Sequence, residues 1–316
     1  MKKAVLPANP GRLLKARFVK TAHVLFIIFL LLQFLEDRAK NPHPAYALAF
    51  IIAVEIVLIL VSILIKKTET ANLFADISGF VYLFIILWTL FTAKFNILKA
   101  SFFPPPGTVF EQAVRDGSVI LGNIRTSLGI VVQGYCLALC LAIPLGILLG
   151  WNIRAGNAAV YISKFLGSIP PVVYIPYGIA LLPTFRSVSV MVIFLASFWP
   201  AFAGTMSGVL HVERQIIESA LSLNVKKIPM LFQIILPAAL PQIFIGCNQG
   251  LTVSFILLTS AEMIGGRSGL GYYVKNFSDF GDYTRIIAGV IVIGIVITVI
   301  TFFFNKLQKF LLRWKG

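Results

Sequence analysis

Long apolar segments recur along almost the whole chain, and this feature limits its possible folds more than any other. A helix needs about 20 predominantly apolar residues to cross a lipid bilayer. About eight segments meet or approach this length, and they lie at residues 18–35, 45–65, 73–93, 128–150, 170–184, 187–210, 241–263 and 285–305. The fifth is short and is interrupted by Pro171, Pro176 and Pro183. The sequence therefore predicts an all-α integral membrane protein, a polytopic bundle of about eight transmembrane helices.

The composition excludes several classes of protein. Of the 316 residues, 58% are hydrophobic and only 12% are charged, with a mean hydropathy of +0.91. Soluble domains carry about 25% charged residues, so a soluble enzyme, a disordered chain and a disulfide scaffold are excluded. The net charge of +15 does not indicate nucleic-acid binding, because the basic residues lie between apolar segments, where they encode membrane orientation. Cys136, Cys140 and Cys247 lie inside apolar runs without metal-ligand spacing, and we interpret them as small core residues.

The first apolar segment and the basic residues predict how the chain sits in the membrane. Basic residues precede segment 18–35, as in a signal peptide, but charged residues follow it directly and no small-residue cleavage site lies close by. We therefore expect a retained anchor. With the N-terminus inside, the inner segments hold most of the 27 Lys and Arg residues. This bias predicts that both termini are cytoplasmic and that the Pro-rich loop 101–118 lies outside.

Small residues recur at four-residue intervals in three of the later segments. Helices in lipid pack closely where small residues let their backbones approach, and this spacing keeps such residues near one face. The predicted packing residues are Gly134, Ala138, Ala142, Gly146, Gly150, Gly204, Gly208, Gly246 and Gly250. We expect a division near residue 100, with an N-terminal accessory membrane segment of about three helices at 1–100 and a compact core at 101–316.

The loop between the sixth and seventh segments, residues 211–241, is more apolar than a solvated loop should be. The pattern predicts a helix over 213–223 that ends at Asn224, a residue type that tolerates the left-handed conformation. A second segment then runs to Pro237, with Pro229 in its first turn. We predict a short helix–turn–helix on the inner side, whose apolar surface marks a partner site.

This loop resembles the EAA motif of ABC importer permeases, which reads E-A-A, three residues, G, nine residues and I-x-L-P. The matching residues are Glu218, Ser219, Ala220, Asn224, Ile234, Leu236 and Pro237. Ser219 stands where the motif has Ala, and Asn224 stands where it has Gly. Because Asn is the residue type most enriched at positive φ after Gly, the turn should survive.

The resemblance extends over about residues 100–316, to the branch that carries nitrate, sulfonates, taurine and bicarbonate. It includes Ile143–Gly146, Ile169–Pro171, Ala261–Gly265 and Ser268–Tyr272, whereas residues 1–70 have no clear counterpart and the first two helices are extra. The resemblance implies the MetI-like core of a type I ABC importer permease in a bacterial inner membrane. It also implies two permease subunits, identical or paralogous, with separate ATPase subunits on the EAA loop and an external solute-binding protein.

The residues themselves suggest no enzyme. The chain contains no Gly-Lys dipeptide and so no P-loop, and we find no catalytic constellation, metal site or cofactor site. A stand-alone secondary transporter is the alternative function, but it would be expected to show inverted repeats, and no internal repeat is found. The resemblance leaves the solute open among nitrate-like, sulfonate-like, bicarbonate-like and vitamin-precursor-like molecules.

Two acids within the predicted spans need an explanation, because a carboxylate within a membrane is costly unless it meets a cavity or a partner. Glu262, beside Ser260 near the outer end of the seventh segment, either lines the translocation pathway or pairs with Arg267 or Arg285. Glu55, in the middle of the second segment, should be protonated or matched, and Tyr82 is its predicted neighbour.

Overall fold

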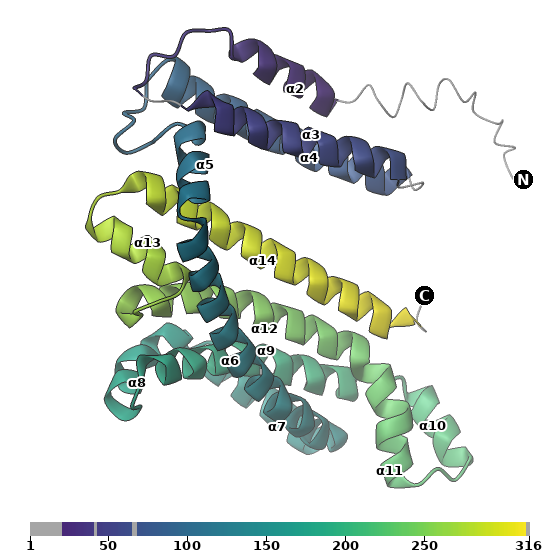
Figure 1. Ribbon diagram of the computed structural model, residues 1–316. Coiled ribbons are helices and arrows are strands. Elements are labelled where there is room, and N and C mark those ends of the chain that lie inside the picture. The colour runs from purple at the N-terminus through teal and green to yellow at the C-terminus, as the bar shows by residue number, and fades with distance from the viewer. Residues whose placement is uncertain (1–20, 41–42, 65–67, 314–316) are drawn as a thin grey trace, which may run out of the picture. The chain divides into compact units, whose positions relative to one another are not determined.

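The computed structural model describes residues 21–40, 43–64 and 68–313, and this part of the chain is helical, without strands (Figure 1). Its elements in chain order are α2 (Thr21–Leu32), α3 (Pro44–Leu64), α4 (Thr68–Thr89), the π-helix η1 (Leu90–Lys94), α5 (Pro106–Arg115), α6 (Gly117–Trp151), α7 (Ile153–Gly167), the 3-10 helix η2 (Pro171–Tyr174), α8 (Ile175–Leu181), α9 (Phe185–Leu210), α10 (Arg214–Ser222), α11 (Lys227–Pro229), the π-helix η3 (Met230–Ile235), α12 (Leu236–Gly265), α13 (Leu270–Asp279) and α14 (Tyr283–Leu311). The predicted all-α membrane fold is confirmed.

Within the described residues, six helices are long and apolar enough to cross a membrane. They are α3, α4 with η1, α6, α9, the continuous α11–η3–α12 segment and α14. The expected fifth span is different, because α7 and the η2–α8 segment are bent by 70° at their junction and form one broken span or a re-entrant loop. Pro170 and Pro171 lack the N–H groups needed to continue α7. Six spans, or seven with this pair, leave the predicted count of about eight unconfirmed.

The N-terminal part of the prediction is only partly described. Helix α2 has 12 described residues and is shorter than a full span. Residues 18–20 of the expected first span lie outside the described residues. The basic residues within 2–20, at 66–67 and at 315, on which the predicted orientation partly rests, also lie outside them.

The contacts divide the chain into two compact units. The first comprises residues 1–117 with 280–288, and the second comprises residues 118–279 with 289–316. In the first unit, α2 and α3 both pack on α4 around a core that includes Phe29, Ile51 and Tyr82. The unit thus contains the segment that the sequence sets apart from the region of resemblance.

A buried polar network links the three N-terminal helices. Tyr82 on α4 donates a hydrogen bond of 2.8 Å to Oε2 of Glu55 on α3, so the predicted pairing is confirmed. His23 on α2 adds a contact that the sequence did not indicate, with its Nδ1 2.5 Å from Oε1 of Glu55. Both carboxylate oxygens therefore have partners inside an apolar core, as a buried carboxyl group requires.

In the second unit, α9 and α12 pack along a seam of small residues. A Cβ atom added at Gly246 would lie 2.5 Å from the Pro200 carbonyl oxygen, and one added at Gly204 would lie 2.8 Å from the Cα of Gly246. Added Cβ atoms at Gly208 and Gly250 would lie 2.9 Å from carbonyl oxygens of the facing helix. The two backbones approach so closely that only glycine fits at these positions.

The small residues of α6 face α9 in the same unit. Gly134, Gly146 and Gly150 lie against Ile193, Thr205 and Val209 respectively, and Ala138 and Ala142 are fully buried on the same face. The cysteines differ from the prediction, because Cys136 and Cys140 are exposed and only Cys247 is buried. Position 136 is two residues from Gly134, and two residues turn a helix by about 200°, which directs the side chain away from the packed face.

Candidate coupling surface and solute pathway

Helix α10 carries the first half of the motif and stands clear of the packed bundle (Figure 1). Ala220 is its buried anchor, and it packs in the core cluster that includes Met230 and Ile235. Glu218 is 62% exposed, and its Oε1 accepts a hydrogen bond of 2.9 Å from Nε of Arg214 one turn earlier. Ser219 is exposed and donates its hydroxyl to the Gln215 carbonyl oxygen.

Asn224 ends this helix through backbone geometry. Its φ is +54°, in the left-handed region. The Asn224 N–H donates to the Leu221 carbonyl, and the Val225 N–H donates to the Ala220 carbonyl. These two bonds form a Schellman motif, in which a left-handed residue closes the last helical turn. The Asn in place of the motif's Gly thus adopts the conformation for which Gly is usually selected.

The second half of the motif does not form the expected short helix that ends at Pro237. Instead, α11 and η3 continue directly into α12, and Pro237 lies in the first turn of α12. A proline ring clashes with the carbonyl four residues before it, and the wider π-helical turn of residues 230–235 relieves this clash without ending the helix. Ile234 and Leu236 are partly buried against the cluster that anchors α10.

Large apolar side chains project from this loop. Their exposed fractions are 40% for Ile216, 61% for Leu221, 79% for Leu223, 73% for Ile228 and 59% for Phe232. We call these five residues, together with Arg214 and Glu218, the loop surface. Beside it lies a mainly apolar cavity of about 320 Å³ whose lining includes Ile153, Ile217 and Leu221. Apolar side chains gathered in this way mark an interaction site.

At the opposite end of α12, Glu262 links the turn that follows this helix to α6 through hydrogen bonds. Its side chain is 2% exposed, and it accepts hydrogen bonds of 2.7 Å from the Ser127 hydroxyl and from the Gly271 N–H. The Leu270 N–H donates to the same Ser127 hydroxyl. An added Cβ at Gly269, which has a φ of +109°, would lie 2.2 Å from the carboxylate. The glycine therefore lets the turn close over Glu262.

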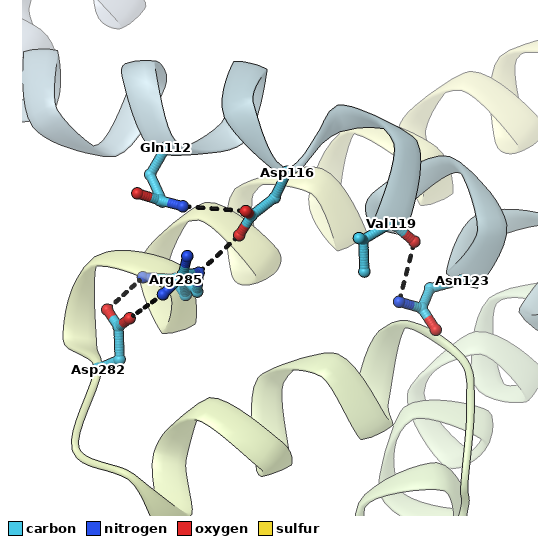
Figure 2. Close-up of polar contacts among 6 residues, drawn as sticks. All are labelled: Gln112, Asp116, Val119, Asn123, Asp282 and Arg285. Carbon is cyan, nitrogen blue, oxygen red and sulfur yellow. Dashed lines mark hydrogen bonds and ion pairs between the residues drawn. The ribbon is translucent and has the colours of Figure 1, made fainter.

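Neighbouring polar residues complete this turn. Asn123 accepts a hydrogen bond of 2.8 Å from the Gly269 N–H, and its amide donates to the Val119 carbonyl (Figure 2). Arg285, one partner expected for Glu262, instead pairs with Asp116 and Asp282 at 2.7 Å each. The partners of Glu262 are thus uncharged groups rather than the arginines that the sequence suggested.

A cavity of about 550 Å³ lies between the beginning of α9 and the end of α12. Its lining consists of Thr126, Ile130, Pro183, Thr184, Phe185, Arg186, Ser189, Glu262, Gly265, Gly266, Arg267 and Ser268. Ser260 is not part of this lining, and its hydroxyl bonds to the Ile256 carbonyl of its own helix. Sequence reasoning did not identify Arg186, and it considered Arg267 only as an ion-pair partner of Glu262. Both flank apolar segments, where a basic residue is normally attributed to membrane orientation.

Comparisons with known proteins decide the family. The sequence profile of the "Binding-protein-dependent transport system inner membrane component" family matches residues 142–315, more than half of the chain. The chain belongs to this family. A probable ABC transporter permease protein of Brucella melitensis is 34% identical over 212 residues, which cover 66% of this chain and 84% of the relative.

Two further relatives of this permease have named solutes. The taurine transport system permease protein TauC of Escherichia coli is 27% identical over 241 residues, 74% of this chain and 87% of the relative. The bicarbonate transport system permease protein CmpB of Synechococcus elongatus is 28% identical over 244 residues, 73% and 86% respectively. The chain is thus a multi-pass permease component of an ABC importer, a system in which separate subunits hydrolyse ATP and a binding protein supplies the solute.

The family match covers the loop surface and the Glu262 turn but begins within α6. The His23–Glu55–Tyr82 network lies outside it. The match begins at residue 142, whereas the predicted resemblance begins at about residue 100, so both leave out residues 1–70 and the predicted division near residue 100 stays a prediction.

Proposed function

We propose that the loop surface of this permease docks on an ABC ATPase subunit and transmits its movements to the bundle. The observation that carries the proposal is the anchoring of α10. The Schellman motif at Asn224 and the burial of Ala220 fix the helix to the continuous α11–η3–α12 segment, while Glu218 and the large apolar side chains stay exposed. A displacement of α10 would therefore pass along one unbroken helix to the Glu262 turn at its far end.

The motif residues have distinct parts in this proposal. Glu218 and Ser219 contact the ATPase, while Ala220, Ile234 and Leu236 hold the docking helix to the bundle and Asn224 and Pro237 shape the backbone. The packing residues of α6, α9 and α12 keep the bundle rigid enough to transmit the movement, because close-packed interiors transmit strain.

The assembly that we propose contains two permease subunits, identical or paralogous, in a bacterial inner membrane, with both termini of each subunit in the cytoplasm. The concentration of Lys and Arg in the inner segments supports this orientation. The solute is a small molecule handed over by an external binding protein. We place it among small molecules that carry an oxyanion group, because the relatives' names include taurine, which carries a sulfonate group, and bicarbonate. Residues 1–100 form an accessory membrane segment.

Co-purification with the ATPase tests the docking proposal. We expect Glu218→Ala to release the ATPase from the purified complex, because it removes the exposed carboxylate of the loop surface. Glu213→Ala is the matched control, since Glu213 is also exposed but lies outside the motif and its side chain caps no backbone N–H. Equal retention of the ATPase by both variants would contradict the proposal. Solute uptake that persists without any ATPase would favour a stand-alone secondary transporter.

A further inference from the structure

The cavity between α9 and α12 contains two arginine side chains that lack acidic partners within the described part of the chain. Arg186 and Arg267 are both exposed, and neither forms an ion pair or a side-chain hydrogen bond there. The Phe185 ring lies against Gly265 and brings the start of α9, which carries Arg186, close to the end of α12, which Arg267 follows. Nη2 of Arg186 lies 3.9 Å from where a Cβ at Gly129 would be, so this guanidinium reaches across to α6.

Glu262 is the one acid among the lining residues, and its hydrogen-bond partners are groups other than these arginines. Both of its oxygens accept hydrogen bonds, from Ser127 and from the Gly271 N–H, and the residue is 2% exposed. Both oxygens of the carboxyl group are therefore occupied by hydrogen bonds to α6 and to the backbone turn. The open part of the cavity is left with two guanidinium groups and no exposed acid among its lining residues.

The remaining polar groups favour an anion as well. Thr184 caps α9, so the positive end of that helix dipole is directed at the cavity. Ser268 lines the cavity with a hydroxyl that makes no hydrogen bond in the described structure. Guanidinium groups bind carboxylate and other planar or tetrahedral oxyanions in a bidentate manner. A halide would leave this donor geometry largely unused.

The cavity lies at the end of α9 and α12 opposite the loop surface. We propose that it is an entry site in which Arg186 and Arg267 transiently hold the oxyanion group, a sulfonate or a carboxylate, of the incoming solute. This inference rests on the proposed function in one respect, because an ATPase at the loop surface places the cavity on the side where the binding protein delivers solute.

A thiol placed in the cavity tests the proposal on the complete permease purified with its ATPase in phosphatidylcholine nanodiscs. Ser268→Cys is introduced after replacement of Cys136, Cys140 and Cys247. We expect the negatively charged sulfonatoethyl methanethiosulfonate to label it faster, relative to the positively charged trimethylammonioethyl reagent, than it labels free cysteine. Arg186→Gln with Arg267→Gln should lower this rate ratio about tenfold, since a cleft lined by one sign of charge concentrates counter-ions. The exposed Arg154→Gln is the matched control and should leave it unchanged.

Protection by oxyanions identifies the ligand class. We expect ethanesulfonate or bicarbonate to slow the labelling of Ser268→Cys, chloride at the same ionic strength to have no such effect, and the double Gln variant to lose the protection. Protection no greater than that by chloride, or protection that persists in the double variant, would overturn the proposal. A parallel set of nanodiscs contains phosphatidylglycerol. If Ser268→Cys is labelled more slowly there than in phosphatidylcholine, with neither ethanesulfonate nor bicarbonate added, the site would be assigned to a lipid phosphate instead of the solute.

These outcomes are independent of the docking experiment. Glu218→Ala should release the ATPase and leave the labelling ratio at Ser268→Cys unchanged, because the two positions lie at opposite ends of the bundle. The docking proposal can therefore fail while oxyanions still protect Ser268→Cys, and the protection can be absent while the docking proposal holds. The two experiments distinguish these results.

Discussion

Asn224 has a φ of +54°, and its substitution should separate backbone conformation from side-chain chemistry. The left-handed conformation costs a residue other than Gly about 1–2 kcal/mol, and a β-branched residue is a genuine outlier there. We expect Asn224→Gly to keep the ATPase bound as the natural protein does, and Asn224→Val to weaken co-purification. Thermal unfolding of both variants is the second measurement. A Val variant that binds as well as the Gly variant would show that the Schellman motif is dispensable.

Gly269 is required for two reasons, its φ of +109° and the 2.2 Å between an added Cβ and the Glu262 carboxylate. Gly281 shares only the first, because it has a φ of +70° but open space around it. Backbone strain of this kind costs about 1–3 kcal/mol. We therefore expect Gly269→Ala to lower the thermal unfolding temperature in detergent well beyond the change caused by Gly281→Ala. Equal shifts would show that the turn yields and that Glu262 does not hold it.

At the scale of elements, the Tyr82–Glu55 hydrogen bond should stabilise the packing of α3 on α4. Removing the Tyr82 hydroxyl leaves Oε2 of a buried carboxyl group unpaired, and an unsatisfied buried polar group costs about 1–3 kcal/mol. We expect Tyr82→Phe to lower the midpoint of heat-induced aggregation, followed by fluorescence-detected size exclusion. Tyr46→Phe on α3 is the control, because Tyr46 is 38% exposed and forms no side-chain hydrogen bond in the described structure. Identical midpoints for the two variants would show that the Tyr82–Glu55 hydrogen bond does not stabilise the protein.

The seam between α9 and α12 should tolerate no larger side chain. At Gly246 even a Cβ would lie 2.5 Å from the Pro200 carbonyl oxygen, whereas at Gly294 on α14 it would meet nothing within 4 Å. We expect Gly246→Leu to abolish the yield of folded permease and Gly294→Leu to preserve it, as judged by a monodisperse elution profile in detergent. Comparable yields would mean that the helices can separate without loss of the fold.

The same elements show which structural features can be predicted from the sequence alone. Six of the spans and the small-residue stripes were predictable, because apolar length and four-residue spacing are local properties of one helix. The bend after Gly167 and the π-helix at 230–235 were not, since prolines permit several backbone solutions and packing selects among them. His23 as a partner of Glu55, and the meeting of Arg186 with Arg267 in one cavity, depend on the packing of separate helices. No local pattern contains that information.

At the scale of the whole molecule, the structure makes the predicted orientation testable with one continuous helix. Residues 227–265 form a single segment long enough to cross a membrane, so Lys226 and Ser268 flank its two ends. Both are exposed. In intact cells that lack the three native cysteines, a membrane-impermeant thiol reagent should label Ser268→Cys and should not label Lys226→Cys. Permeabilised cells should show labelling of both, which controls for thiol reactivity. Labelling of Lys226→Cys in intact cells would place the loop surface outside, away from any cytoplasmic ATPase, and would overturn the orientation and the docking proposal together.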